Sequence, residues 1–171
     1  MEELWKPLKY SGIAKHKSVE YSKNSLKVDV SNSAMPLIYP ISPSHQTYGL
    51  IVKGYAYSLP TLRKSLQGSK GNDDFLVRIG LVLKGKKKLS WLQKKLSPSW
   101  VKTLFDLAPK GVGIDKIEFY NVYQDIRLKG VSKEHPKADG LMIEHNITFI
   151  DKEGSFSLEK SFKNPKDVLA I

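Results

Sequence analysis

The chain has 171 residues, of which 40% are hydrophobic and 26% charged, and its formal net charge is +11. This is the composition of one globular domain with a hydrophobic core, which excludes a wholly disordered chain. Because cysteine is absent, disulfides, thiolate metal sites and cysteine nucleophiles are excluded as well. No apolar run approaches the roughly 20 residues of a membrane-spanning helix, and the start, MEELWKPLKY, lacks the apolar core of a signal peptide.

Three β-strands are predicted in the first third of the chain, after an N-terminal extension of residues 1–24. Alternating apolar side chains indicate the first strand, and two prolines give the second an edge or bulged character, because proline cannot donate to a β-ladder. The third, YGLIVKGYAY, contains Gly49 and Gly54, which indicate a bend or a close backbone approach. These strands cover residues 25–30, 35–41 and 48–57.

Residues 75–83, FLVRIGLVL, give the strongest strand signal of the sequence. The nearly continuous apolar run predicts a central strand that is covered on both faces. Arg78 lies in its middle, where an unpaired charge would be costly. Either it pairs with a carboxylate, or it lies on a concave face and binds an anionic ligand. The candidate carboxylates are Asp74, Glu118 and Glu144.

Residues 84–110 form a basic insert with a helical period. We expect a short helical turn near residues 90–95 and a longer helix from Pro98 to Leu107, since Ser97 followed by Pro98 is an N-cap and first-turn pair. Lysines interleaved with tryptophan and leucine favour contact with anionic lipid or another anionic surface, or else a lid helix with its lysines outward. The candidate surface lysines are Lys86, Lys87, Lys88, Lys94 and Lys95.

Three further strand signals follow, at residues 116–124, 141–151 and 156–162. The last two flank DKEG, whose Gly154 provides a turn, so they are predicted to form a hairpin. The final VLAI looks like the start of another strand. Seven or eight strands with one helical excursion predict a mainly β protein, a single β-sandwich or jelly roll over residues 1–171.

The order of these features resembles that of a known group of proteins. An Asp-Asp pair opens a strand with an arginine in its middle, DDFLVR, which follows YGLIVKGYAY and precedes a tryptophan-bearing excursion and an alternating strand. This order resembles an uncharacterised family of exported bacterial β-sandwich proteins with a DD-aromatic-x-x-R strand. The resemblance implies a jelly-roll scaffold similar to carbohydrate-binding modules and a periplasmic or exported location. It also implies a last strand that continues past VLAI or is borrowed.

Candidate catalytic or metal-binding residues are few. Asp73 and Asp74 are adjacent, so at a strand entrance they point to opposite faces and cannot share one proton as a catalytic pair would. In a loop both could bind a calcium ion, or they could serve only in turn formation. The sequence has no GxSxG, no Walker loop and no metal-binding histidine spacing. No catalytic residue and no cofactor other than calcium is therefore predicted.

Aromatic side chains offer a different kind of site, because sugar rings stack on exposed aromatic faces. Tyr55 and Tyr57 share one face of a predicted strand, and Tyr120 and Tyr123 lie together on another. The alternative is that such rings pack in the core or at its rim. The candidate ligand-binding residues are Arg78, Tyr55, Tyr57, Tyr120, Tyr123, Trp91 and Trp100.

The sequence thus predicts a non-catalytic domain that binds a carbohydrate or an anionic cell-envelope polymer. One alternative is a glycan lyase or hydrolase, which needs two carboxylates or a Tyr-His-Arg group that converge in space. A second is a peripheral membrane or nucleic-acid binder that uses the basic insert, with nucleic acid the less favoured partner. A third is an assembly protein whose edge at VLAI pairs with a partner strand.

Overall fold

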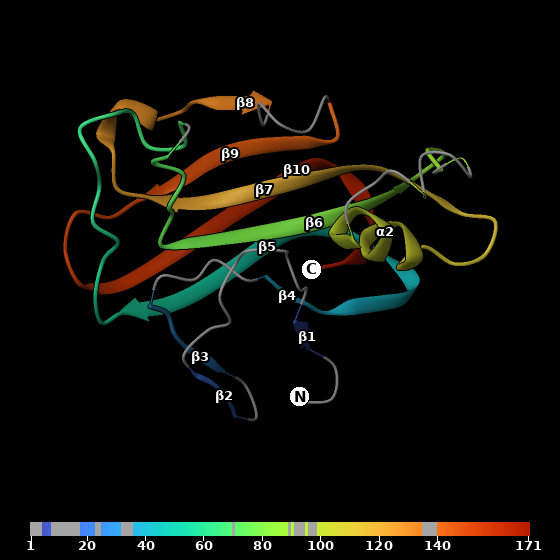
Figure 1. Cartoon of the computed structure of the whole chain (residues 1–171), viewed down its shortest axis with the longest axis horizontal. Helices are drawn as coiled ribbons and strands as arrows, with labels where there is room; N and C mark the ends of the chain where they lie inside the picture. The colour runs from blue at the N-terminus through green and yellow to red at the C-terminus, as the bar shows by residue number, and fades with distance from the viewer. Residues whose placement is uncertain are drawn as a thin grey trace.

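The structure is a computed structural model that describes residues 5–7, 18–22, 25–31, 36–69, 71–88, 90, 95, 99–134 and 140–171. It confirms the prediction of a mainly β protein. Six strands form one mixed sheet in the order β5-β10-β6-β7-β9-β8 (Figure 1). They are β5 (Pro40–Ala56), β6 (Val77–Gly85), β7 (Gly113–Tyr123), β8 (Ser132–Glu134), β9 (Met142–Phe149) and β10 (Gly154–Ala170).

Strand β6 confirms the central strand predicted at residues 75–83, because it pairs with β10 on one side and β7 on the other. All neighbouring strands of the sheet are antiparallel except β7 and β9, which run parallel. The chain passes from β7 to β9 through the 3-10 helix η1 (Ile126–Leu128) and the edge strand β8.

Two short antiparallel ribbons accompany the sheet and lie on its lower side in Figure 1. They pair β1 (Lys6–Pro7) with β4 (Leu37–Ile38) and β2 (Ser18–Tyr21) with β3 (Leu26–Asp29). Strand β3 confirms the prediction for residues 25–30, whereas the expected N-terminal extension contributes β1 and β2. A sandwich of two opposed sheets is not confirmed.

The sheet has a hydrophobic core on each of its faces. Ile117 and Phe119 of β7 belong to a cluster with Leu104 of helix α2 (Ser99–Asp106). Tyr120 belongs to a second cluster with Leu158 of β10. Since neighbouring residues of a strand point to opposite faces, the helix covers one face of β7, and the β5–β10 pair folds over the other. The apolar side of α2 is thus used in the core, as the lid alternative requires.

The hairpin predicted for residues 141–151 and 156–162 is wrong. Strand β9 pairs with β7 and β8, whereas β10 pairs with β5 and β6. Strands β9 and β10 are linked by a side-chain hydrogen bond and not by a β-ladder: Thr148 Oγ1 donates to the backbone carbonyl of Ser157 at 2.9 Å. The turn at Gly154 shows only that the chain reverses. The partner of β10 is decided by the long pairing with β5.

The final VLAI is not the start of an edge strand. Val168 pairs with His45 of β5 on one side and with Leu83 of β6 on the other, and both Val168 and Ala170 have 0% exposure. The segment is therefore the end of β10 and lies in the interior of the sheet. It has no open edge at which a partner strand could pair.

Gly49 and Gly54 mark close approaches between β5 and β10, as predicted. A Cβ atom at Gly49 would lie 2.8 Å from the carbonyl oxygen of Lys160, and one at Gly54 would overlap the ring of Phe156. The absence of a side chain at these positions lets the two long strands pack closely.

Candidate binding surfaces

Arg78 is held by two carboxylates and two aromatic rings. Its Nη2 lies 2.9 Å from Asp73 and 3.2 Å from Glu144. Its Cζ lies 4.6 Å from the ring centre of Phe75 and 5.5 Å from that of Phe119. Glu144 is one of the candidate partners named from the sequence, and of the two adjacent aspartates it is Asp73, not Asp74, that pairs with Arg78. Arg78 therefore joins the segment before β6 to β9, which is a structural arrangement.

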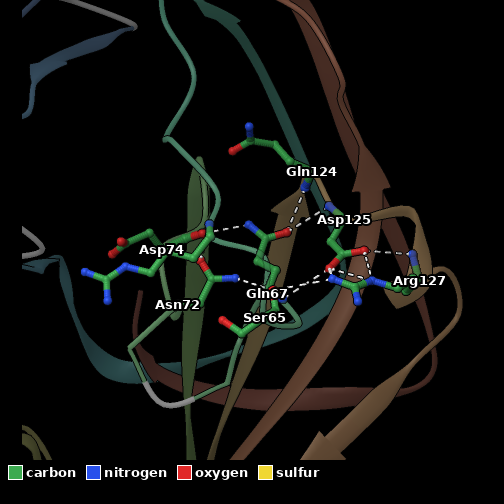
Figure 2. A network of polar contacts seen from close by, with 8 residues as sticks. Ser65, Gln67, Asn72, Asp74, Gln124, Asp125 and Arg127 are labelled. Carbon is green, nitrogen blue, oxygen red and sulfur yellow. Dashed lines mark hydrogen bonds and ion pairs between the residues drawn. The ribbon is translucent and has the colours of Figure 1, made fainter.

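A buried amide fixes the loop that carries Asp74. Gln67 has 0% exposure, and its Nε2 donates to the backbone carbonyl of Asp74 at 2.6 Å. Its Oε1 accepts from the backbone N–H groups of Gln124 and Asp125 at 2.9 and 3.0 Å (Figure 2). The side chain of Gln67 thus joins this loop to the end of β7. Its three hydrogen bonds satisfy polar groups that would be costly to bury without partners.

Asp125 completes this network at the start of η1. Its carboxylate accepts from the backbone N–H of Gln67 at 3.2 Å and from Nε and Nη2 of Arg127 at 2.8 and 2.6 Å (Figure 2). The hydrogen bonds from Arg127 outweigh burial and lower the pKa of Asp125 to about 2. Among the described residues, no group of three or more histidine, aspartate or glutamate side chains could hold a metal ion. The calcium hypothesis for Asp73 and Asp74 stays a prediction.

The basic insert is described only in part. The candidate surface lysines Lys86, Lys87, Lys88 and Lys95 are exposed. Trp91 and Lys94 lie outside the described residues, as does the side chain of Trp100 and most of the helical turn expected near residues 90–95. None of the helices in the described part of the chain is long and apolar enough to cross a bilayer.

The four candidate tyrosines fall into two groups. Tyr55 and Tyr57 are 56% and 74% exposed, with ring centres 4.8 Å apart and ring planes inclined by 51°. Tyr120 and Tyr123 are only 1% and 3% exposed. The rings of Tyr120 and Tyr123 therefore pack in the interior, and of these four described tyrosines a ligand that stacks from solvent can reach Tyr55 and Tyr57.

A groove continues the surface of Tyr55 and Tyr57 along β5 and β10. Its volume is about 450 Å³. Ile51, which lines the groove, is 70% exposed and pairs with Glu159, while Tyr55 pairs with Ser155 further along. We call this surface the outer face; it comprises Gly49, Ile51, Lys53 and Tyr55 of β5, Tyr57 just after that strand, and Ser155, Ser157, Glu159 and Ser161 of β10. At the strand rise of about 3.3 Å per residue, it extends for about 25 Å.

A second concavity, the basic cleft, lies where β10 passes the face of β7 and β9. Its volume is about 380 Å³. It is lined by Glu118, Tyr120, His145, Lys160, Ser161, Phe162, Lys163, Asn164 and Lys166. Of the catalytic groups that a glycan-active enzyme would need, it brings together a tyrosine and a histidine, with lysines in place of the arginine. Its described lining includes one carboxylate.

Glu118 is the electrostatic centre of the basic cleft. Its carboxylate accepts from Lys166 Nζ at 2.7 Å and from the Tyr120 hydroxyl at 2.5 Å, and Lys116 Nζ lies 3.7 Å away. Burial alone would raise the pKa of Glu118, but the hydrogen bonds and the two lysine charges lower it. Burial and the bond to Glu118 raise the pKa of Tyr120. At neutral pH, Glu118 is therefore ionised and Tyr120 protonated.

His145 packs beside this centre. Its ring stacks on Tyr120 with centres 5.2 Å apart and planes inclined by 20°, and its Nδ1 lies 2.9 Å from Ser132 Oγ. Burial lowers the pKa of His145, and the charges of nearby lysines lower it further, while Glu118 opposes them. The imidazole is therefore neutral at pH 7.

Sequence reasoning missed the basic cleft because its members come from distant segments. The parallel pairing of β7 and β9 places Tyr120 opposite His145, and the register of β10 brings Lys166 to Glu118. The available signal was the segment SFKNPKDV, in which Pro165 marks a bulge between two lysines.

Comparison of the chain with protein-family models, with curated proteins and with solved structures gives no match. The described residues form a mainly β domain in which the groove of the outer face and the basic cleft share one strand, β10. Its function therefore has to be argued from the chemistry of those surfaces.

Proposed function

We propose that the protein binds carbohydrate on its outer face, with the glycan chain lying along β5 and β10. The observation that carries this proposal is the exposed pair of Tyr55 and Tyr57, which lies further along the β5–β10 pair than the groove. Large aromatic side chains are mostly buried in cores or interfaces, and a clustered exposed pair indicates a surface with a partner. Sugar rings present C–H faces that pack on such rings.

The polar groups of the outer face suit the hydroxyl groups of a sugar. Serines occupy most of its β10 positions, and Ser157 Oγ lies 2.8 Å from Glu159 Oε1, where both can share hydrogen bonds with a ligand. Lys53 and Glu159 have opposite charges, so the face has no net charge. A few placed polar groups beside an apolar platform are the usual make-up of a ligand site, and here they favour a neutral glycan.

The test is a glycan array, followed by calorimetry with the sugars that bind. Replacing Tyr55 or Tyr57 by alanine removes half of the platform, and we expect each variant to bind about three- to tenfold more weakly, as the loss of about 0.5–1.5 kcal/mol of aromatic contact implies. The matched control is Tyr48→Ala, which removes a tyrosine of the same strand that is 67% exposed and outside the pair.

Two results would contradict the proposal. One is an array on which the unaltered protein binds no glycan. The other is a set of affinities in which Tyr55→Ala and Tyr57→Ala weaken binding no more than Tyr48→Ala does. Thermal unfolding of each variant shows that the fold is retained, which is expected because all three side chains are exposed.

A further inference from the structure

We propose that the basic cleft is a second ligand site, which binds an oxyanion, a carboxylate or a phosphate, carried by a single saccharide ring. The cleft and the groove of the outer face have only Lys160 and Ser161 in common. Glu118, Tyr120 and His145, which line the cleft, come from β7 and β9 and have no part in the outer face. Apart from those two shared residues, the sites are built from different side chains, so either can exist without the other.

The charge of the lining favours an anionic ligand. Three lysines, Lys160, Lys163 and Lys166, face one carboxylate, Glu118, which is already bonded to Lys166 and Tyr120. Among the residues that the structure describes, Lys160 and Lys163 have no ion-pair partner, and both are exposed. The cleft therefore carries a surplus of two positive charges. Low-dielectric walls focus such a field on an anion within the cleft.

The backbone of β10 is irregular at the cleft. Ser161 pairs with Gly49 and Lys166 pairs with Thr47, so residues 162–165 all lie opposite the single residue Tyr48. In a bulge of this kind the extra residues are not paired in the β-ladder, and the direction of their side chains changes. Bulges are common beside ligand sites. Here the bulge carries Lys163 and Asn164 into the lining. Without it, regular alternation would continue the flat surface of the outer face.

An aromatic ring forms part of the lining. The ring of Phe162 is half-buried, with its centre 5.7 Å from that of Tyr120 and 5.1 Å from Lys166 Nζ. An apolar ring next to a cation matches a ligand that has both a C–H face and an anionic substituent. Asn164 adds an amide, and Ser161 adds a hydroxyl for the ring hydroxyl groups.

The size of the cleft limits its ligand. A volume of about 380 Å³ is near the lower end of the range of about 300–1,000 Å³ for small-molecule pockets. It fits one ring with its substituent. Lysines bind oxyanions as point charges, without the bidentate geometry of arginine, so the lining accepts either a carboxylate or a phosphate. Glu118 holds Lys166 in place before a ligand arrives, which reduces the ordering that binding requires.

The experiment is calorimetric titration of the full chain at low ionic strength with four probes: glucuronate, glucose 6-phosphate, glucose and inorganic phosphate. We expect at least one of the two acidic sugars to bind, with an affinity at least tenfold higher than that of glucose. The double variant Lys160→Ala, Lys163→Ala should weaken that binding at least tenfold. The control Lys129→Ala, Lys152→Ala removes the same charge at two exposed positions outside the cleft and should leave the affinity within about twofold, because exposed charges outside the cleft interact with the ligand only weakly through water.

The outcomes separate the parts of the proposal. Binding of glucuronate alone identifies a carboxylate site, and binding of the sugar phosphate alone identifies a phosphate site. Inorganic phosphate that binds as tightly as glucose 6-phosphate would overturn the assignment to a saccharide. Failure of both acidic sugars to bind, or equal losses in the two double variants, would overturn the site. None of these probes requires the outer face, so a failed glycan array leaves this test intact.

Discussion

Two buried carboxylates on neighbouring strands, Glu144 of β9 and Glu118 of β7, each organise a cluster of charged side chains. Glu144 lies 3.2 Å from Arg78 and 3.8 Å from Lys133, and Arg78 is also paired with Asp73. This cluster contains two positive and two negative side chains. Glu118 has Lys166 and Lys116 as partners and lies in a cleft that two more lysines enter.

The alternation of the strands places these clusters on opposite faces of the sheet. Phe119, which is paired with Glu144, packs in the core beneath α2, while Tyr120, which follows it, packs beneath the β5–β10 pair. The balanced cluster is closed, with Glu144 1% exposed. The unbalanced one opens into a cavity. The difference indicates which of two similar charge clusters is structural and which is available to a ligand.

The largest effect is expected from breaking the balanced cluster with Glu144→Gln. The substitution keeps the shape but leaves Arg78 and Lys133 without their buried carboxylate, and removal of one member of a buried ion pair costs about 3–5 kcal/mol. Urea unfolding should show this loss, and the melting temperature should fall by about 6–20 °C. Glu153→Gln, in the exposed turn before β10, is the control and should be neutral. A loss below about 1 kcal/mol would show that the cluster is not structural.

An intermediate effect is expected from Glu118→Gln, which makes the basic cleft more positive. Lys166 lines the open cleft, so water can solvate it after the carboxylate is lost, and we expect a smaller destabilisation of about 1–2 kcal/mol. Two unit charges 4 Å apart in water interact by roughly 1 kcal/mol, which corresponds to about fivefold in affinity. Removal of a negative charge near the ligand should therefore tighten glucuronate binding about fivefold. Calorimetry measures the change. Glu144→Gln should leave this affinity unchanged, and equal effects of the two substitutions would remove the distinction between the clusters.

The two clusters also show how much of the fold and of the candidate sites could be predicted from the sequence. The apolar run around Arg78 predicted β6 correctly, and the cost of an unpaired charge left two alternatives for Arg78, of which pairing with a carboxylate such as Glu144 is the one observed. Strand alternation placed Tyr55 and Tyr57 on one face. These are local properties, which the residues of one segment determine.

The features that were missed depend on pairing between distant segments. The turn at Gly154 indicated a hairpin, but β10 obtains more pairing from β5, about 100 residues earlier in the chain. The basic cleft needs this pairing, the parallel register of β7 and β9, and a bulge in β10. No periodicity within one segment contains that information, because register is decided by the strands that meet.

The smallest expected effect concerns pH and the basic cleft. His145 has a pKa below its usual value, chiefly because it is buried and also because Lys160, Lys166 and Lys116 are near, against the opposing charge of Glu118. Above pH 7 it is neutral in both the folded and the unfolded chain. As pH falls below the unfolded pKa of about 6.5, the unfolded chain takes up the proton first, so His145 makes folding less favourable in acid.

Protonation of folded His145 has the opposite effect on the ligand, because it adds a positive charge to the cleft. Between about pH 7.5 and 5, glucuronate binding should tighten up to about fivefold, while the melting temperature falls. Glucuronate is the suitable probe, since its carboxylate stays ionised over this range. In His145→Asn the affinity should no longer depend on pH, whereas in His45→Asn, which alters an exposed histidine of β5, the dependence should persist. If affinity and stability changed with pH in the same direction, or if His145→Asn kept the full dependence, the charge in the cleft would not be the one that the ligand meets.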